Sequence, residues 1–262
     1  MNGGSDEAKR RAGEAAAERV TDGEVVGLGT GSTAAHAIRA LGRRVEAGLD
    51  VRGVPTSYQS RQLAREVGVP LTTLEDATPD VAIDGADEVT GVVAPADGAA
   101  DGAAGAEEAA AAEGSGAAEK AASDERARFD CVKGGGAAHA REKVVDAAAD
   151  RLLLVVDPSK LAAALSQPVP VAVLPDAVPT VADRVRDLGG EPELRAAERK
   201  DGPVVTDTGN LVLDCAFGPV ETPADLAPAL SAVPGAVEHG LFVDLADAVV
   251  VGREDGADVY SR

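Results

Sequence analysis

The segment that most constrains this chain is residues 25–34, where a short apolar run gives way to glycines and hydroxyls before an alanine-rich stretch. Glycines permit a tight turn close to a ligand, and the helix start that follows offers unpaired N–H groups and a positive dipole end. The lysine that a P-loop carries before its Ser/Thr is absent. The segment therefore predicts a loop for a single phosphate, with an ordinary helix cap as the alternative. Its candidate binding residues are Thr30, Gly31, Ser32 and Thr33.

A Gly-x-Gly-x-x-Ala pattern that begins at Gly29 also fits the relaxed dinucleotide-binding fingerprint. That fingerprint requires an acidic residue at the end of the next strand, where it holds a ribose. The next strand is expected at residues 51–54 and is followed by Pro-Thr-Ser, whereas Asp50 precedes it. An acid at that end of the strand is misplaced, so the sequence favours a phosphate over NAD.

Composition narrows the possible partners. The 262 residues carry a formal net charge of -20, which argues against nucleic acids and anionic membranes. Hydrophobic residues make up 45% and aromatic residues only 2%, so a core must be built from Val, Leu, Ala and Ile. The acidic excess, the scarcity of lysine and the many small residues indicate a surface adapted to high salt, where self-repulsion is screened. An ordinary acidic protein is the alternative.

Cys131 and Cys215 are far apart and neither has a CxxC partner, which favours two buried thiols in a reducing compartment. The first 19 residues are polar and contain no apolar run of the kind found in a signal peptide. A cytoplasmic location is therefore expected.

Expected strands and helices alternate through the first 160 residues, which predicts βαβ units and a doubly wound, mostly parallel sheet of the α/β class. Residues 168–236 read differently, as β-α-β-β-α with a hairpin near Gly209, and predict a smaller ferredoxin-like α+β domain. Residues 1–167 and 237–262 then form a Rossmann-like catalytic domain. Residues 91–128 contain almost no large apolar side chains and are expected to be an acidic, low-complexity insertion loop.

Four expected strands end in polar loops: the phosphate loop, residues 84–88, residues 133–136 and residues 157–160. The carboxyl ends of parallel strands share one edge of a sheet, so all four loops are expected to line one pocket. A carboxylate there can remove a proton beside a carbonyl, while a lysine and backbone N–H groups stabilise the resulting enediolate. The set indicates an aldose–ketose isomerase that acts on a sugar phosphate without a metal.

Simpler interpretations exist for each motif. The carboxylates of Asp84, Asp87 and Glu88 could bind Mg²⁺ or cap a helix. Glu142 could be an ordinary surface charge between Arg141 and Lys143. The three histidines show no metal-ligand spacing and are expected to be structural or solvated.

Taken together, the motifs resemble the ribose-5-phosphate isomerase A family. The matching segments, in the same order as in that family, are residues 27–34, 84–88, 133–143, 157–160, 206–210 and 240–242. The resemblance implies interconversion of D-ribose 5-phosphate and D-ribulose 5-phosphate in the pentose phosphate pathway, without a cofactor. It also implies a homodimer or homotetramer.

The resemblance assigns roles by position. Glu142 is the expected general base between C1 and C2, and Lys133 with the amides of the triple glycine is expected to steady the enediolate. Asp84 and Asp87 are expected to hold sugar hydroxyls and assist ring opening. Lys160 and, from the first helix, Lys9 are expected to contact substrate. The remaining expected substrate-binding residues are Gly85, Ala86, Gly134, Gly135 and Gly136.

This chain departs from the family pattern at the long insertion before Lys133 and at Thr208, where the family often has Asn. Two other functions fit parts of the pattern. A sugar-phosphate sensor would need no base but would be accompanied by a DNA-binding segment, and an amino-sugar phosphate isomerase/deaminase would release ammonia from glucosamine 6-phosphate.

Overall fold

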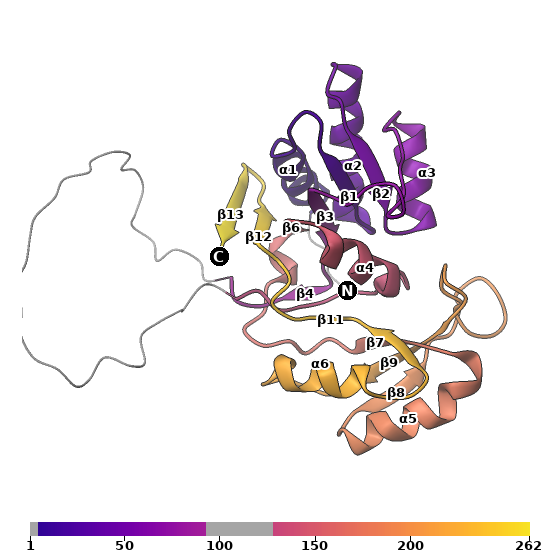
Figure 1. Ribbon diagram of the computed structural model, residues 1–262. Coiled ribbons are helices and arrows are strands. Elements are labelled where there is room, and N and C mark those ends of the chain that lie inside the picture. The colour runs from indigo at the N-terminus through magenta and orange to yellow at the C-terminus, as the bar shows by residue number, and fades with distance from the viewer. Residues whose placement is uncertain (1–4, 93–127) are drawn as a thin grey trace, which may run out of the picture.

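A six-stranded sheet forms the centre of the larger part of the molecule (Figure 1). The computed structural model describes residues 5–92 and 128–262, so the predicted insertion loop lies almost wholly outside the described residues. The strand order is β13-β12-β6-β3-β1-β2, and all neighbours run parallel except β13, which pairs antiparallel with β12. The strands are β1 (Val25–Leu28), β2 (Arg52–Pro55), β3 (Val81–Gly85), β6 (Leu152–Val156), β12 (Ala248–Gly252) and β13 (Ala257–Ser261).

Helices α1, α2 and α3 pack on one face of this sheet, and α4 packs on the other beside the segments that carry Phe129 and Phe242. Alternate side chains such as Val26 and Val155 pack on one face against α1 and α2. Their neighbours Leu152 and Leu154 pack on the other face against Phe129 and Phe242. The helices of this part are α1 (Asp6–Ala17), α2 (Ser32–Glu46), α3 (Tyr58–Glu66) and α4 (His139–Ala148), with a 3-10 turn η1 (Pro158–Lys160).

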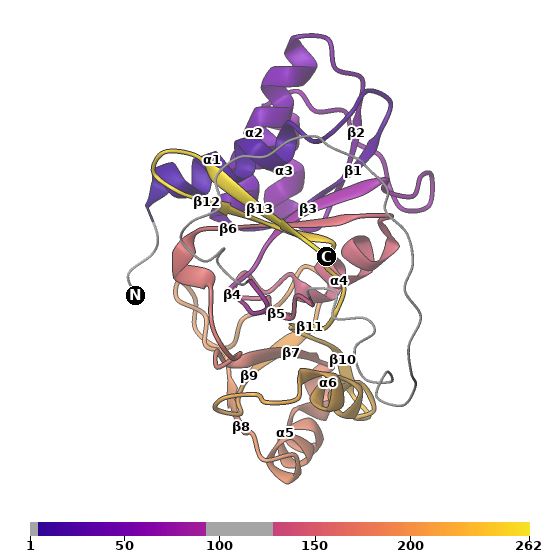
Figure 2. The same ribbon diagram turned by 90° about the vertical axis from the view of Figure 1, so that its left-hand side faces the viewer.

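A three-stranded antiparallel sheet lies between the large sheet and the second one (Figures 1 and 2). It consists of β4 (Glu88–Val89), β5 (Cys131–Val132) and β11 (Leu241–Phe242). The prediction that the strand before Lys133 belongs to the parallel sheet is therefore wrong. That strand pairs with β4 and β11, because the chain leaves the parallel sheet after β3 and returns to it only at β6.

The second, four-stranded sheet has the predicted ferredoxin-like connectivity. Its order β10-β7-β9-β8 is 4-1-3-2 in order of appearance, and all pairs are antiparallel. α5 and α6 pack on one of its faces (Figure 1). The elements are β7 (Val169–Val173), η2 (Pro175–Ala177), α5 (Val178–Asp187), β8 (Glu191–Leu194), β9 (Leu211–Ala216), α6 (Pro223–Ser231) and β10 (Ala236–His239). β10 continues past the predicted limit at residue 236 because it completes this sheet.

Residues 70–74 join the large sheet through one bridge between Gly53 and Leu71. The turn near Gly209 forms, with the Gly209 amide donating to the Thr206 carbonyl at 2.9 Å. However, β9 pairs along its length with β7 on one side and β8 on the other, whereas the first arm of the expected hairpin contributes one bridge between Val205 and Leu211.

None of the helices in the described ranges combines the length and the apolar character needed to cross a membrane.

Candidate active site

The loop after β1 is built as a binding surface for an anion. Gly31 caps α2 with a φ of 108°, a conformation that favours glycine, and no side chain caps the free N–H groups of the first turn. Thr30 is held from beneath: its amide donates to Asp84 Oδ1 at 2.9 Å and its hydroxyl bonds to Ser57 Oγ at 2.7 Å. The first turn of α2 contains no acidic residue, so its positive end faces the loop unopposed.

The acidic residues after β3 are divided between the site and the scaffold. Asp84 is fully buried at the end of β3, and Asp87 accepts a hydrogen bond from the Gly135 amide at 2.7 Å. Glu88 instead accepts from the backbone amides of Ser166 and Gln167 at 2.6 and 2.9 Å. Glu88 therefore fixes the segment that leads to β7 and does not join the other two carboxylates, which weakens the magnesium interpretation.

Lys133 enters the site from the three-stranded sheet. Its Nζ lies 3.0 Å from Asp84 Oδ2 and donates to the Gly85 carbonyl at 2.5 Å, and the residue is only 2% exposed. Its backbone amide donates to the Gly240 carbonyl at 2.8 Å, and the ring of Phe242 lies under its ammonium group. Because β5 pairs with β4 on one side and with β11 on the other, the position of the lysine that follows β5 is fixed.

Glu142 lies on the first turn of α4 and completes the group. Its Oε2 is 3.8 Å from Lys133 Nζ, and this buried oxygen has no hydrogen-bond partner among the described residues. α4 lies between the large sheet and the four-stranded sheet (Figure 1), which explains why a charged residue on it is buried. The interpretation of Glu142 as a surface charge is therefore wrong.

Burial changes the acid–base behaviour of this group. Burial raises the pKa of Glu142 to about 8, against the opposing effect of Lys133 and with the support of Asp84. For Lys133, burial acts to lower the pKa, but the surrounding carboxylates, led by Asp84, hold it above its usual range. At neutral pH the lysine is charged and the glutamate can both lose and accept a proton.

A cavity of about 150 Å³ joins these loops. Among the predicted residues, all four of the phosphate loop line it, together with those of the other three loops: Gly85, Ala86, Asp87, Lys133, Gly134, Gly135, Gly136, Glu142 and Lys160. Asp84 lies directly beneath, against Lys133. Lys9 is not part of the lining, because α1 packs on α2 and β12. The prediction that the four loops converge is thus met.

Sequence reasoning missed three residues of the site. Gln59 lines the cavity from α3, and its position just after the carboxyl end of β2 could have revealed it. Asp146 is buried one helical turn beyond Glu142, a spacing that places both on one face of α4. Arg195, directly after β8 of the four-stranded sheet, donates a hydrogen bond to the Gly134 carbonyl at 2.9 Å. Nothing in the sequence indicates that contact.

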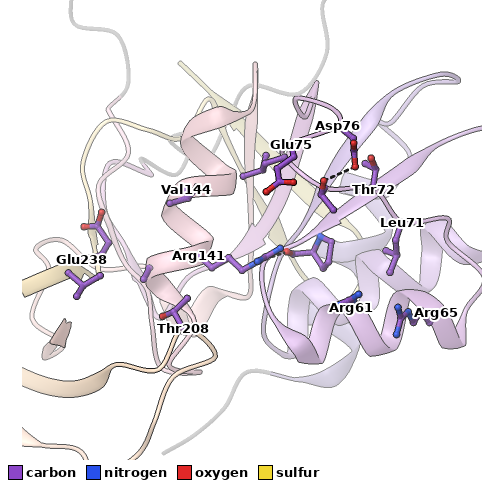
Figure 3. A pocket seen from close by; sticks show the side chains of 15 residues that line it. Arg61, Arg65, Leu71, Thr72, Glu75, Asp76, Arg141, Val144, Thr208 and Glu238 are labelled. Atoms are coloured by element: carbon purple, nitrogen blue, oxygen red, sulfur yellow. Dashed lines mark hydrogen bonds between the residues drawn. The ribbon is translucent and has the colours of Figure 1, made fainter. Parts of the chain in front are cut away.

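A larger groove of about 870 Å³ lies on the other side of α4 (Figure 3). We call it the α4 groove. Its charged lining residues are Arg61, Arg65, Glu75, Asp76, Arg141 and Glu238.

The fold and the cavity together define an α/β enzyme equipped for proton transfer on a small phosphorylated substrate. Comparison with known proteins identifies the family within this class of enzyme. The family model described as ribose 5-phosphate isomerase A (phosphoriboisomerase A) matches residues 52–108 and 121–256. The chain therefore belongs to the ribose 5-phosphate isomerase A family.

Individual relatives of this family match the chain over nearly its whole length. Ribose-5-phosphate isomerase A of Natronomonas pharaonis is 62% identical over 99% of both chains, and that of Haloarcula marismortui is 58% identical over 98% of this chain and 96% of its own. Among solved structures, ribose 5-phosphate isomerase A of Methanocaldococcus jannaschii has a TM-score of 0.81 and 35% identity, covering 98% of this chain and 99% of its own. A D-ribose-5-phosphate isomerase in complex with phospho-erythronic acid has a TM-score of 0.82 and 34% identity, with full coverage of both chains.

Proposed function

We propose that this enzyme interconverts D-ribose 5-phosphate and D-ribulose 5-phosphate, with Glu142 as the base that moves the proton between C2 and C1. The observation that carries the assignment is the buried Glu142 carboxylate, 3.8 Å from the Lys133 ammonium, in a cavity also lined by the phosphate loop. A phosphorylated sugar acid is bound by the 34% identical relative, which supports a substrate of this class.

The reaction moves one hydrogen from C2 to C1 and one from O2 to O1, so the overall charge does not change. Glu142 takes the C2 proton, which leaves an enediolate, and returns it to C1. Lys133 and the amides of Gly134 to Gly136 stabilise the enediolate oxygen, which is the role that a fixed cation and N–H groups play best in a dry site.

The other residues bind and orient the substrate. Thr30 to Thr33 and the start of α2 hold the phosphate, and Lys160, which also lines the cavity, adds a positive charge. Asp84 and Asp87 hold sugar hydroxyls and assist ring opening, which must precede proton transfer. Lys9 has no contact with the cavity that supports a role in binding. No cofactor is needed for any of these steps, and we place the enzyme in the cytoplasm.

Replacement of Glu142 by Gln tests the assignment. The amide keeps the shape of the side chain but cannot accept the proton, so kcat falls about 100-fold or more. Substrate binding persists, because the phosphate loop is untouched. Both are measured with ribose 5-phosphate, by turnover and by calorimetry. Near-normal turnover in a folded Glu142→Gln enzyme contradicts the role of Glu142.

We also propose that the chain is a homo-oligomer whose two-fold contact uses the α4 groove. Exposed apolar side chains border it, with Val144 56% and Val237 46% exposed. Three arginines and three acids line it (Figure 3), and a two-fold contact brings the same patch together on both copies, so opposite charges can face each other.

Charge exchange tests this contact. Arg61→Glu with Arg65→Glu, and separately Glu75→Arg with Asp76→Arg, should each weaken assembly, and mixing the two variants should restore it. Light scattering gives the mass in each case, and Arg39→Glu on α2, away from the groove, serves as the control. If both double variants keep the mass of the original protein, the contact lies elsewhere.

A further inference from the structure

Asp146 is a buried acid that the proposed reaction does not use. It follows Glu142 by one turn of α4, its side chain is inaccessible to solvent, and Oδ2 lies 4.0 Å from Lys133 Nζ. Neither of its oxygens has a hydrogen-bond donor among the described residues. An ionised carboxylate without a donor in such a place is very costly, so the residue needs an explanation.

Asp84 is the neighbour that explains it. Asp84 Oδ1 accepts hydrogen bonds from the amides of Thr30 and Gly85 at 2.9 and 2.7 Å, whereas the buried Oδ2 has none, although Lys133 Nζ lies 3.0 Å away. The two carboxyl groups lie against the same ammonium group, with Asp84 Oδ2 at 3.0 Å and Asp146 Oδ2 at 4.0 Å from Lys133 Nζ. A proton on Asp146 would give both groups a partner at once.

The charges of the cluster lead to the same conclusion. Within the part of the chain that the structure describes, Lys133 is the one cation that contacts the carboxyl groups of Asp84 on β3 and of Glu142 and Asp146 on α4. The thiol of Cys131, two residues before Lys133 on β5, is buried, and burial keeps its pKa above the usual range, so it adds no charge. Ionisation of all three acids would leave two uncompensated negative charges in the interior.

The negative charge belongs on Asp84 and not on Asp146. Asp84 has two backbone donors and the lysine, all of which stabilise an ionised carboxylate, whereas Asp146 has no donor. Burial and the neighbouring Asp84 raise the pKa of Asp146 well above its ordinary value.

We propose that Asp146 keeps a proton in the working enzyme and donates a hydrogen bond through it to Asp84 Oδ2, and that it thereby acts as a positioning residue for Lys133 and Glu142. The neutral acid holds Asp84 in place, and Asp84 in turn holds the Lys133 ammonium. Because Asp146 adds no negative charge, Glu142 stays the one acid of the cluster that ionises in the working pH range. The kinetic part of this inference rests on the proposed function.

Two substitutions of Asp146 distinguish the effect of its hydrogen-bond donor from the effect of the size of its side chain. Asp146→Asn places an N–H donor where the acid has its O–H, so kcat should stay within about threefold and the pH profile should be unchanged. Asp146→Leu has a similar size but no donor, so kcat should fall about tenfold or more, with KM little changed. Circular dichroism confirms that each variant is folded. A large kcat loss or a shifted pH profile in Asp146→Asn overturns the proposal, as does a fully active Asp146→Leu.

Infrared spectroscopy tests the proton without any substrate. The difference spectrum of the original protein minus Asp146→Asn should contain the C=O stretch of a protonated carboxyl group at the pH of the assay. Absence of that band overturns the proposal even if Asp146→Leu does not fold. If the original protein fails to convert ribose 5-phosphate, the proposed function is wrong, while the band still reports the state of Asp146.

Discussion

Glu142 is an acid in surroundings that oppose its charge. The residue is 4% exposed, and its buried Oε2 has no donor among the described residues. Burial raises its pKa to about 8, and only Lys133 offsets the effect. A base works best when its pKa is close to the pH at which it operates, so this environment suits a residue that takes and returns a proton.

The pH dependence of kcat/KM should reflect this shift. Glu142 must be ionised to take the C2 proton, and its raised pKa leaves it mostly protonated at pH 6. Activity should therefore rise with pH, by about tenfold per unit well below 8, and level off above it. Initial rates between pH 6 and 9 measure this rise. An activity that is flat across this range contradicts the assignment.

At the scale of single residues, much of the site could be predicted from the sequence, because glycines, hydroxyls and acids directly after apolar strands are visible in one dimension. Asp146 and Arg195 could not, since the first looks like any helix acid and the second comes from another sheet. Lys9 is a different case. The resemblance gave it a role, and because it does not line the cavity that role stays a prediction.

Elements are placed by close contacts between backbones. α1 and α2 cross where a Cβ on Gly13 would lie 2.6 Å from the Ala37 nitrogen, so only glycine lets the two helices approach this far. α2 begins at the phosphate loop, and the crossing therefore also helps to fix the loop.

Gly13→Ala should destabilise the protein by about 1 to 3 kcal/mol, because an added methyl group forces two packed helices apart. Denaturant unfolding measures the change. Gly256→Ala is a matched control, since a Cβ there meets nothing within 4 Å and the same glycine-to-alanine change should have little effect. Equal losses in the two variants would show that the crossing is not tight.

The sequence predicted elements better than it predicted their partners. Runs such as Leu152–Val156 indicate a buried strand, and the starts of α1 and α3 follow ordinary N-capping rules. β5 and β8 are different, because two residues in one case and a polar stretch in the other carry no periodic signal. The positions of β5 and β8 are set by pairing with strands that are distant in the sequence. Local sequence patterns do not reveal such pairing.

The whole molecule carries a formal net charge of -20, and its most similar relatives include enzymes from halophilic organisms. At about 0.1 M salt the screening length is about 10 Å, and at 1 M it is about 3 Å, so repulsion across the surface fades over this range. We expect the unfolding midpoint and the activity both to rise as KCl increases from 0.1 to above 1 M.

Thermal unfolding and initial rates along a KCl series test this expectation. Sucrose, which favours the compact state without screening charge, serves as the control. Full folding and full activity in dilute buffer would mean that the acidic surface is not an adaptation to salt.

The pairing of β5 with β11 has a consequence for synthesis. Lys133 is supported by the Gly240 carbonyl, and the sheet edge beside β6 is covered only when β12 arrives. We therefore expect a nascent chain that has not yet reached residue 240 to be inactive, although it already contains Lys133, Glu142 and the phosphate loop. The support for the lysine comes from a strand that is synthesised about a hundred residues after it.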